Sequence, residues 1–223
     1  MNGGIISTLE DIFYPWPMTC AACGERTGSN GILCRACGDK LSNFTPLLNF
    51  ARADGIDASA AAHMYTKQAA VMVRGLKYSA LRSLVREMAD HMLAAAHFAG
   101  FAVPDAVTYV PMHWTRRQNR FYNHAQLLAE LIAGDMGAEM AGGIVRVRPC
   151  RQQARIHDDA DRMKNVRGAF RARMDFTGKR VMLIDDVYTT GATAGECAMA
   201  LRAAGAEKVV LLTYAAAYKP HIP

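Results

Sequence analysis

Two adjacent carboxylates, Asp185 and Asp186, end an apolar run in the segment RVMLIDDVYTTGAT, which covers residues 180–193. Carboxylates at the end of a buried strand can bind Mg²⁺, accept hydrogen bonds from sugar hydroxyls or act as an acid/base pair. A purely structural role is disfavoured because neighbouring carboxylates repel each other when they have no partner. The sequence therefore marks this pair as the candidate catalytic residues.

A turn rich in hydroxyls and backbone N–H groups follows the acid pair. Its glycine is free to take a positive φ, and the turn opens directly into a predicted helix whose dipole favours an anion. Diol-binding acids followed by such an anion cradle are typical of a ribose 5-phosphate site. The turn lacks the lysine and spacing of a Walker A loop, so ATP hydrolysis of that kind is disfavoured. The turn residues are Thr189, Thr190, Gly191, Ala192 and Thr193.

Four of the six cysteines form two C-x-x-C pairs separated by ten residues: Cys20, Cys23, Cys34 and Cys37. This spacing is typical of a structural zinc site, in which four thiolates complete a tetrahedral coordination. Two disulfides and a redox pair are the alternatives. Disulfides are disfavoured without an export signal, and a redox C-x-x-C pair would not be duplicated. Cys197 lies among small residues of a predicted helix and is interpreted as a packed hydrophobe.

Positive charge is concentrated in one part of the chain. The formal net charge is +6, and residues 146–180 alone carry eleven Lys and Arg against four Asp. A basic strip of this kind favours an anionic partner such as phosphate, pyrophosphate or a nucleic-acid backbone. A solvated arginine-rich loop is the simpler alternative.

The chain of 223 residues is long enough for one α/β domain and a small accessory module. Its apolar stretches are too short to cross a bilayer, so no membrane insertion is expected. The first residues are interpreted as a short amphipathic helix and not as a signal peptide, with one apolar face formed by Ile5, Leu9, Ile12 and Phe13. We therefore expect a cytoplasmic protein.

Helical and apolar segments alternate after the cysteines, which predicts a parallel sheet covered on both faces. Ligands of such sheets bind beyond the carboxyl ends of the strands. Residues 42–59 are weakly patterned and are interpreted as a linker. We expect a module over residues 1–45 and a main domain over residues 46–223. The predicted helices cover 65–98 (interrupted near Gly75 and Ser79), 123–134 and 193–205, and the predicted strands cover 106–110, 142–148, 181–184 and 208–216.

The segment VMLIDDVYTTGAT resembles the phosphoribosyl pyrophosphate (PRPP) motif of type I phosphoribosyltransferases. The wider pattern resembles the ComF family, from Cys20 to Thr213. Its features occur in order: the four-cysteine knuckle, GLKYSALRSL (75–84), VPMHWTRRQNRFYNHAQLLAE (110–130), RMKNVRGAF (162–170) and the PRPP motif. The resemblance implies a Rossmann-like parallel sheet of the type I phosphoribosyltransferase kind with a small N-terminal zinc module.

The resemblance also implies roles for individual residues. Asp185 and Asp186 would bind the ribose hydroxyls, and residues 189–193 the 5-phosphate. A mobile basic segment, 151–167, would cover the site. The loop that meets the pyrophosphate would be formed by Pro111, Met112 and His113, with nearby cations at Lys77, Arg116, Arg117 and Arg120.

Simpler roles compete with several of these. Lys77 and the arginines are also consistent with surface side chains, His113 with a capped loop histidine, and Asn123 with a helix N-cap. The chain departs from the family at residues 120–124, which are Arg-Phe-Tyr-Asn-His where R-G-F-N-Q is usual. A phenylalanine at position 121 argues against a close backbone approach there, and His124 changes what can bind opposite the ribose.

The activity implied by the resemblance is Mg²⁺-dependent displacement of pyrophosphate from PRPP by a nitrogen nucleophile. The alternative is a non-catalytic protein of DNA uptake and natural transformation that works with the competence machinery. In that interpretation the zinc knuckle and the basic strip bind single-stranded DNA, and the PRPP pocket is a sensor or a relic. Trp16, Trp114 and Tyr122 would then stack on bases.

Overall fold

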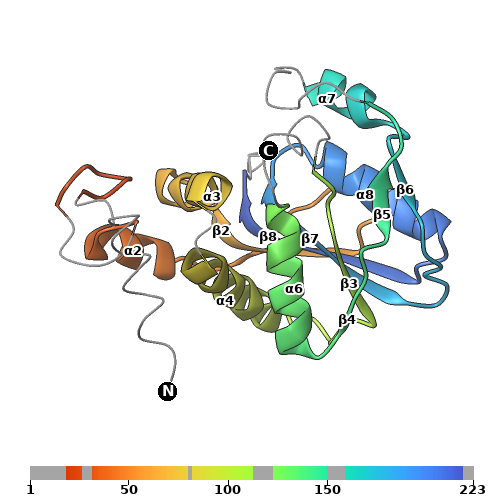
Figure 1. Ribbon diagram of the computed structural model, residues 1–223, viewed down its shortest axis with the longest axis horizontal. Coiled ribbons are helices and arrows are strands. Elements are labelled where there is room, and N and C mark those ends of the chain that lie inside the picture. The colour runs from red at the N-terminus through yellow and green to blue at the C-terminus, as the bar shows by residue number, and fades with distance from the viewer. Residues whose placement is uncertain (1–18, 27–31, 80–81, 113–122, 150–158, 218–223) are drawn as a thin grey trace, which may run out of the picture.

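The protein is an α/β structure built on a mostly parallel sheet, and the computed structural model describes residues 19–26, 32–79, 82–112, 123–149 and 159–217. Figure 1 shows the main sheet with helices packed against both of its faces. The strand order is β1-β2-β8-β7-β3-β4, with every neighbouring pair parallel except β1 and β2. The predicted α/β class and parallel sheet are therefore confirmed.

The strands of the main sheet are β1 (Leu47–Leu48), β2 (Ala58–Met64), β8 (Lys208–Ala216), β7 (Arg180–Tyr188), β3 (Ala106–Tyr109) and β4 (Glu139–Met140). A separate antiparallel pair is formed by β5 (Ile144–Arg146) and β6 (Phe170–Ala172). The helices are α2 (Arg35–Ser42), α3 (Lys67–Ser79), α4 (Arg82–Phe98), α6 (His124–Met136), α7 (Asp159–Val166) and α8 (Ala192–Ala203).

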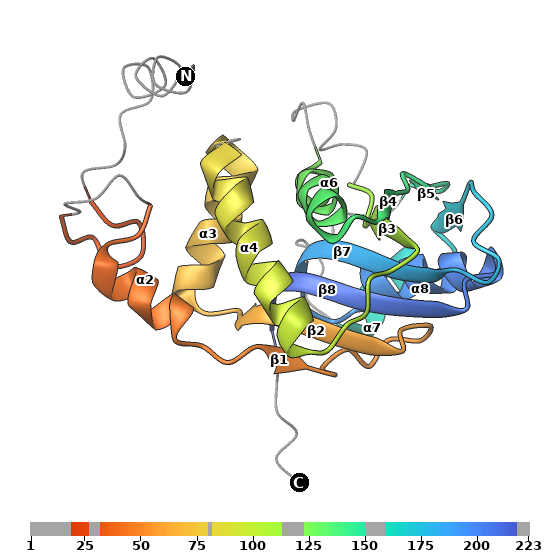
Figure 2. The ribbon, with the colours of Figure 1, turned by 90° about the horizontal axis from the view of Figure 1, so that it is seen from below.

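Strand β7 supplies side chains to two hydrophobic cores, one on each face of the sheet. Met182 and Ile184 pack with α4 and α6, whereas Val181 and Leu183 pack with α8. Figure 2 shows α4 and α6 on the side of the sheet away from α7. Both faces are covered, which explains why β7 and β8 are almost continuous apolar runs in the sequence.

Two of the sequence interpretations need correction. Residues 42–59, interpreted as a linker, contain β1 and the start of β2, and β2 pairs with β8 inside the main sheet. The strand predicted at 142–148 exists as β5, but it pairs with β6 outside the main sheet. The arginine-rich segment between these two strands contains the helix α7.

The strand predicted at 181–184 is longer in the structure, where β7 covers Arg180–Tyr188, so the acid pair lies inside the strand near its end. The remaining predicted elements are present with similar bounds. The predicted 65–98 helix is divided into α3 and α4, and the helix predicted from Asn123 is α6. The last strand, β8, has the predicted bounds. The amphipathic helix predicted at the N-terminus lies outside the described residues.

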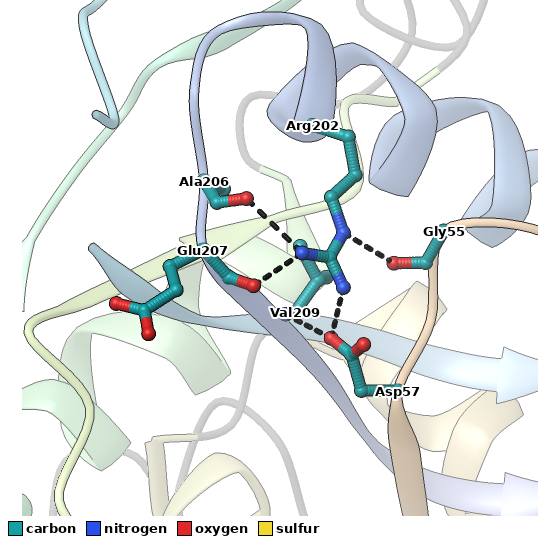
Figure 3. A network of polar contacts seen from close by, with 6 residues as sticks. All are labelled: Gly55, Asp57, Arg202, Ala206, Glu207 and Val209. Atoms are coloured by element: carbon teal, nitrogen blue, oxygen red, sulfur yellow. Dashed lines mark hydrogen bonds and ion pairs between the residues drawn. The ribbon is translucent and has the colours of Figure 1, made fainter. Parts of the chain in front are cut away.

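The carboxyl end of α8 is fixed by a network around Arg202 (Figure 3). Its guanidinium donates to the carbonyls of Gly55, at 3.3 Å, and Ala206, at 3.1 Å, and also to the Glu207 carbonyl and the Asp57 carboxylate. The same carboxylate accepts a 2.6 Å hydrogen bond from the Val209 amide. This arginine therefore joins α8, the segment before β2 and the start of β8.

Within the described ranges, no helix combines the length and apolarity needed to cross a membrane.

Candidate functional site

The acid pair lies near the carboxyl end of β7, between β3 and β8. Asp185 is in register with Thr213 of β8, and the preceding Ile184 carbonyl accepts a 2.9 Å hydrogen bond from the Val110 amide. Both carboxylates are half-buried, and Asp185 accepts a 2.8 Å hydrogen bond from the Asp186 amide. The strand thus holds the two acids at the edge of the sheet where parallel α/β folds bind ligands.

The predicted anion cradle connects β7 to α8 without an intervening linker. Gly191 is the N-cap of α8 and has a φ of +78°, and its carbonyl accepts a 2.7 Å hydrogen bond from the Gly195 amide. The Ala192 amide donates to the Thr190 hydroxyl at 3.4 Å. The helix begins at Ala192, one residue earlier than predicted, so the first amides of the helix follow directly on the turn.

Two requirements select glycine at position 191. Its positive φ is strained for any residue with a Cβ. A Cβ at this position would also lie 2.3 Å from the hydroxyl oxygen of Tyr188. The backbone of the cradle is therefore packed directly against the last side chain of β7.

The predicted pyrophosphate loop follows β3 at the same edge of the sheet. Pro111 and Met112 come directly after Val110, which is bonded to Ile184 of β7, and both are half-buried. The structure thus brings these two residues and the acid pair to neighbouring strand ends. Lys77 belongs to α3. The remaining predicted residues of this loop and its cations, His113, Arg116, Arg117 and Arg120, lie outside the described residues.

Asn123 acts as the N-cap of α6. Its side-chain oxygen accepts a 3.1 Å hydrogen bond from the Ala125 amide, and its amide nitrogen donates to the Val110 carbonyl at 3.2 Å. The N-cap interpretation is therefore confirmed, and the same side chain ties α6 to the end of β3. His124 is buried in the first turn of this helix, with 4% of its surface exposed.

Arg146 ends β5 and is a cation that the sequence predicts only as the first residue of the basic strip. Its guanidinium lies 4.7 Å from the centre of the Phe170 ring, a cation–π geometry. Burial first, and then the charge of Asp185, raise the pKa of the Cys197 thiol, while the charge of Arg146 lowers it. Cys197 itself is fully buried, as expected for a packed hydrophobe.

The four cysteines form one compact cluster, with all four sulfur atoms within 4.8 Å of one another. The Cys23 and Cys34 sulfurs lie 3.7 Å apart. Burial and then hydrogen bonds with the other three thiols raise the pKa of Cys37 to about 12. Gathered thiols are difficult to ionise together without a cation, and four thiolates are the preferred donor set of a structural zinc ion. The residues present therefore fit zinc, as the sequence predicts.

The cysteine cluster packs directly on α3. Val71 of this helix belongs to the same buried cluster as Cys20, Cys34 and Cys37. A Cβ at Gly75 would lie 2.8 Å from the Cδ1 atom of Ile32, so Ile32 packs closely against α3 at this glycine. The four-cysteine module and the main sheet are thus linked through α3, which follows β2.

Comparison with known proteins identifies the family. No family model matches the chain. The DNA utilization protein YhgH of Salmonella typhi is 28% identical over 196 residues, which are 85% of this chain and 80% of that protein. YhgH of Salmonella typhimurium is 31% identical over 65% of this chain and 66% of that protein. Competence protein F of Haemophilus influenzae is 32% identical over 48% of each chain.

The chain belongs to the ComF family. Solved structures similar to this ComF-family chain include glutamine PRPP amidotransferase from B. subtilis, which is 27% identical over 57% of this chain and 25% of that one, with a TM-score of 0.38. Another is an allosteric regulatory enzyme of purine biosynthesis, which is 25% identical over 58% of this chain and 25% of that one, also with a TM-score of 0.38.

Proposed function

We propose that this ComF-family protein binds PRPP with Mg²⁺ at the carboxyl edge of the sheet. There it transfers the phosphoribosyl group to a nitrogen acceptor and releases pyrophosphate. The observation that carries this proposal is the continuity of the site. Asp185 and Asp186 lie near the carboxyl end of β7, and the turn with a positive φ at Gly191 leads from β7 into α8. One short segment thus offers acceptors for ribose hydroxyls and donors for a phosphate.

Each part of the site has a defined task in this reaction. The acid pair would orient the ribose and stabilise positive charge that develops on the sugar. The amides of the 189–193 turn would hold the 5-phosphate, and the loop that begins at Pro111 would meet the pyrophosphate. Carboxylate oxygens are ligands that suit Mg²⁺, which when bound would supply positive charge to the leaving pyrophosphate. The predicted cover of the site, 151–167, lies outside the described residues over 151–158, and its remainder includes α7.

The test replaces both acids with the isosteric amides, Asp185→Asn and Asp186→Asn, and measures PRPP binding with Mg²⁺ by calorimetry. Asparagine keeps the size of the side chain and an acceptor for the Asp186 amide, so the fold should be retained. We expect binding to be abolished. Asp135→Asn, an exposed site on α6, is the matched control. Unchanged PRPP affinity in the double variant would refute the assignment.

Transfer itself is tested by pyrophosphate release from PRPP in the presence of candidate amines. Release that depends on both the amine and the acid pair would support an enzyme. Tight PRPP binding without release for any amine would favour the sensor interpretation instead.

A second candidate function, binding of single-stranded DNA, is supported by a specific surface. Four exposed cations make no ion pair within the described part of the chain: Lys164, Arg167, Arg171 and Arg173. They lie on or next to α7 and β6, beside the proposed PRPP site. The names of two relatives refer to DNA utilization and to competence. A role in DNA uptake with the competence machinery is therefore the alternative proposal.

Salt dependence separates the two functions. If the four cations neutralise DNA phosphates, the affinity for single-stranded DNA should fall steeply with salt, with a slope of about three on a double logarithmic scale. Arg171→Gln with Arg173→Gln should reduce that slope and leave PRPP binding unchanged. Both functions can hold in one protein, and loss of only one activity in each variant would show this.

The proposed organisation follows from these assignments. Residues 1–45 would form the zinc module and residues 46–223 the phosphoribosyltransferase-like domain. We propose the cytoplasm as the site of action, where the thiols of the module stay reduced and available to zinc.

A further inference from the structure

The segment from Phe50 to Asp57, here called the strap, runs along α8. A Cβ at Gly195 would lie 2.8 Å from the Ala53 Cβ, and a Cβ at Gly55 would lie 3.1 Å from the α8 backbone at Ala198. The Arg202 network in Figure 3 fixes the last part of the strap. The strap is therefore held along the helix whose first turn forms the cradle.

The first part of the strap contacts Tyr188, the last residue of β7. The Phe50 and Tyr188 rings meet edge to face, with centroids 5.0 Å apart. The Arg52 amide donates a 3.2 Å hydrogen bond to the Tyr188 hydroxyl. Only 8% of the Tyr188 surface is exposed. The same hydroxyl lies against Gly191, so one oxygen atom joins the strap to the cradle.

A phosphate bound at the cradle would carry more negative charge than the helix N-terminus can balance, so a cation is expected nearby. The turn itself, residues 189–193, contains no Lys or Arg. A phosphate monoester carries a charge of about −1.5 to −2, whereas a helix N-terminus offers only about +0.5. The backbone amide of Arg52 is hydrogen-bonded to the Tyr188 hydroxyl. The Arg52 side chain is exposed and makes no hydrogen bond or ion pair with any residue that the structure describes. Its long side chain is sufficient to reach the cradle.

We propose that Arg52 is a further phosphate-binding residue of this site. The strap and Tyr188 hold Arg52 beside the cradle. Its ligand is the phosphate monoester end of a phosphoribosyl compound, and the inference rests on the function proposed above. Arg52 would contribute a charge-assisted hydrogen bond, and Tyr188 is a positioning residue that acts through the Arg52 backbone.

The test measures binding of ribose 5-phosphate and of Mg²⁺-pyrophosphate to the full zinc-loaded chain by calorimetry. Arg52→Gln should weaken ribose 5-phosphate binding about tenfold, the usual size of one charge-assisted hydrogen bond, and leave Mg²⁺-pyrophosphate binding unchanged. Arg52→Lys should restore most of the affinity, because it keeps the charge. Lys208→Gln, an exposed cation at the opposite edge of the sheet, should change neither affinity.

Other binding results would overturn the Arg52 assignment, either alone or together with the proposed function. If the wild-type chain binds ribose 5-phosphate and Arg52→Gln binds it equally well, the Arg52 assignment is overturned and the proposed function stands. Equal weakening for both ligands would also overturn it, because a 5-phosphate contact should not affect the pyrophosphate. If the wild-type chain binds neither ribose 5-phosphate nor PRPP, the proposed function and this inference fail together.

Tyr188→Phe tests the positioning role. This variant keeps the ring against Phe50 but loses the oxygen that accepts from the Arg52 amide. We expect ribose 5-phosphate binding to weaken several-fold, with Mg²⁺-pyrophosphate binding unchanged. Combined with Arg52→Gln it should add little further loss, because both changes act on one contact. Fully additive losses would show that Tyr188 does not act through Arg52.

Discussion

Protonation of His63 should destabilise the fold in mild acid. Only 4% of the His63 surface is exposed, and its Nε2 atom lies 2.9 Å from the Nδ1 atom of His91. The rings of Phe44 and Tyr214 also face it. Burial first, and then the charge of His91, lower the pKa of His63 from 6.5 to about 4, although the Leu41 backbone opposes the shift.

The sign and size of the effect follow from this pKa. Between pH 6.5 and about 4 the unfolded chain binds a proton at this residue more tightly than the folded chain does, so stability falls as the pH falls through that range. A shift of this size corresponds to about 3 kcal/mol in total. About 2 kcal/mol of it should be lost between about pH 7 and about pH 5.

Urea unfolding at a series of pH values measures this loss. His63→Gln keeps a donor and an acceptor near His91 but does not titrate. Between about pH 7 and about pH 5, the free energy of unfolding of the wild-type chain should therefore fall by about 2 kcal/mol more than that of the variant. His97→Gln, at an exposed histidine near the end of α4, should retain the wild-type dependence. Acid loss of zinc affects all three proteins equally and cancels in the comparison. Equal acid sensitivity of wild type and His63→Gln would refute the reasoning.

Three further predictions concern the cradle, the metal and the strap. Gly191→Ala introduces a Cβ at a positive φ against Tyr188; it should cost about 1–3 kcal/mol in urea unfolding and abolish ribose 5-phosphate binding in calorimetry. Cys37→Ser should lower the zinc content from about one ion per chain in a metal assay and lower the melting temperature, whereas Cys197→Ser should leave the zinc content unchanged. Arg202→Met removes four hydrogen bonds and should lower the free energy of unfolding by about 3 kcal/mol; a loss under about 0.5 kcal/mol, as at an ordinary surface site, would contradict this.

The fold was predictable where local pattern and burial agree. Strands β7 and β8 are apolar runs bounded by glycine and charge, and the sequence located both. Strand β2 was missed because its residues, ASAAAHM, are mostly alanine, which has a low preference for strands and a high one for helices. Its alanines are selected by close packing in the interior of the sheet, which local sequence does not reveal. The strand β5 was recognised, but a strand pattern does not specify its partner.

The candidate site could be recognised in the sequence because its parts are contiguous. The acid pair and the cradle lie within nine residues, Asp185 to Thr193, so both groups of the candidate site appear in one continuous segment of the sequence. Arg52 and Tyr188 are 136 positions apart, and no local pattern relates them. Their contact depends on the strap packing along α8, which only the folded chain shows.

The main sheet ends on each side with a strand of only two residues, β1 at one border and β4 at the other. Among the described residues, each outermost strand therefore offers an incoming chain only two residues of strand, although the interior strands β7 and β8 are long and apolar. Short outer strands of this kind protect a sheet from stacking edge to edge with other copies. Short outer strands thus limit edge-to-edge growth of a sheet whose central strands are apolar.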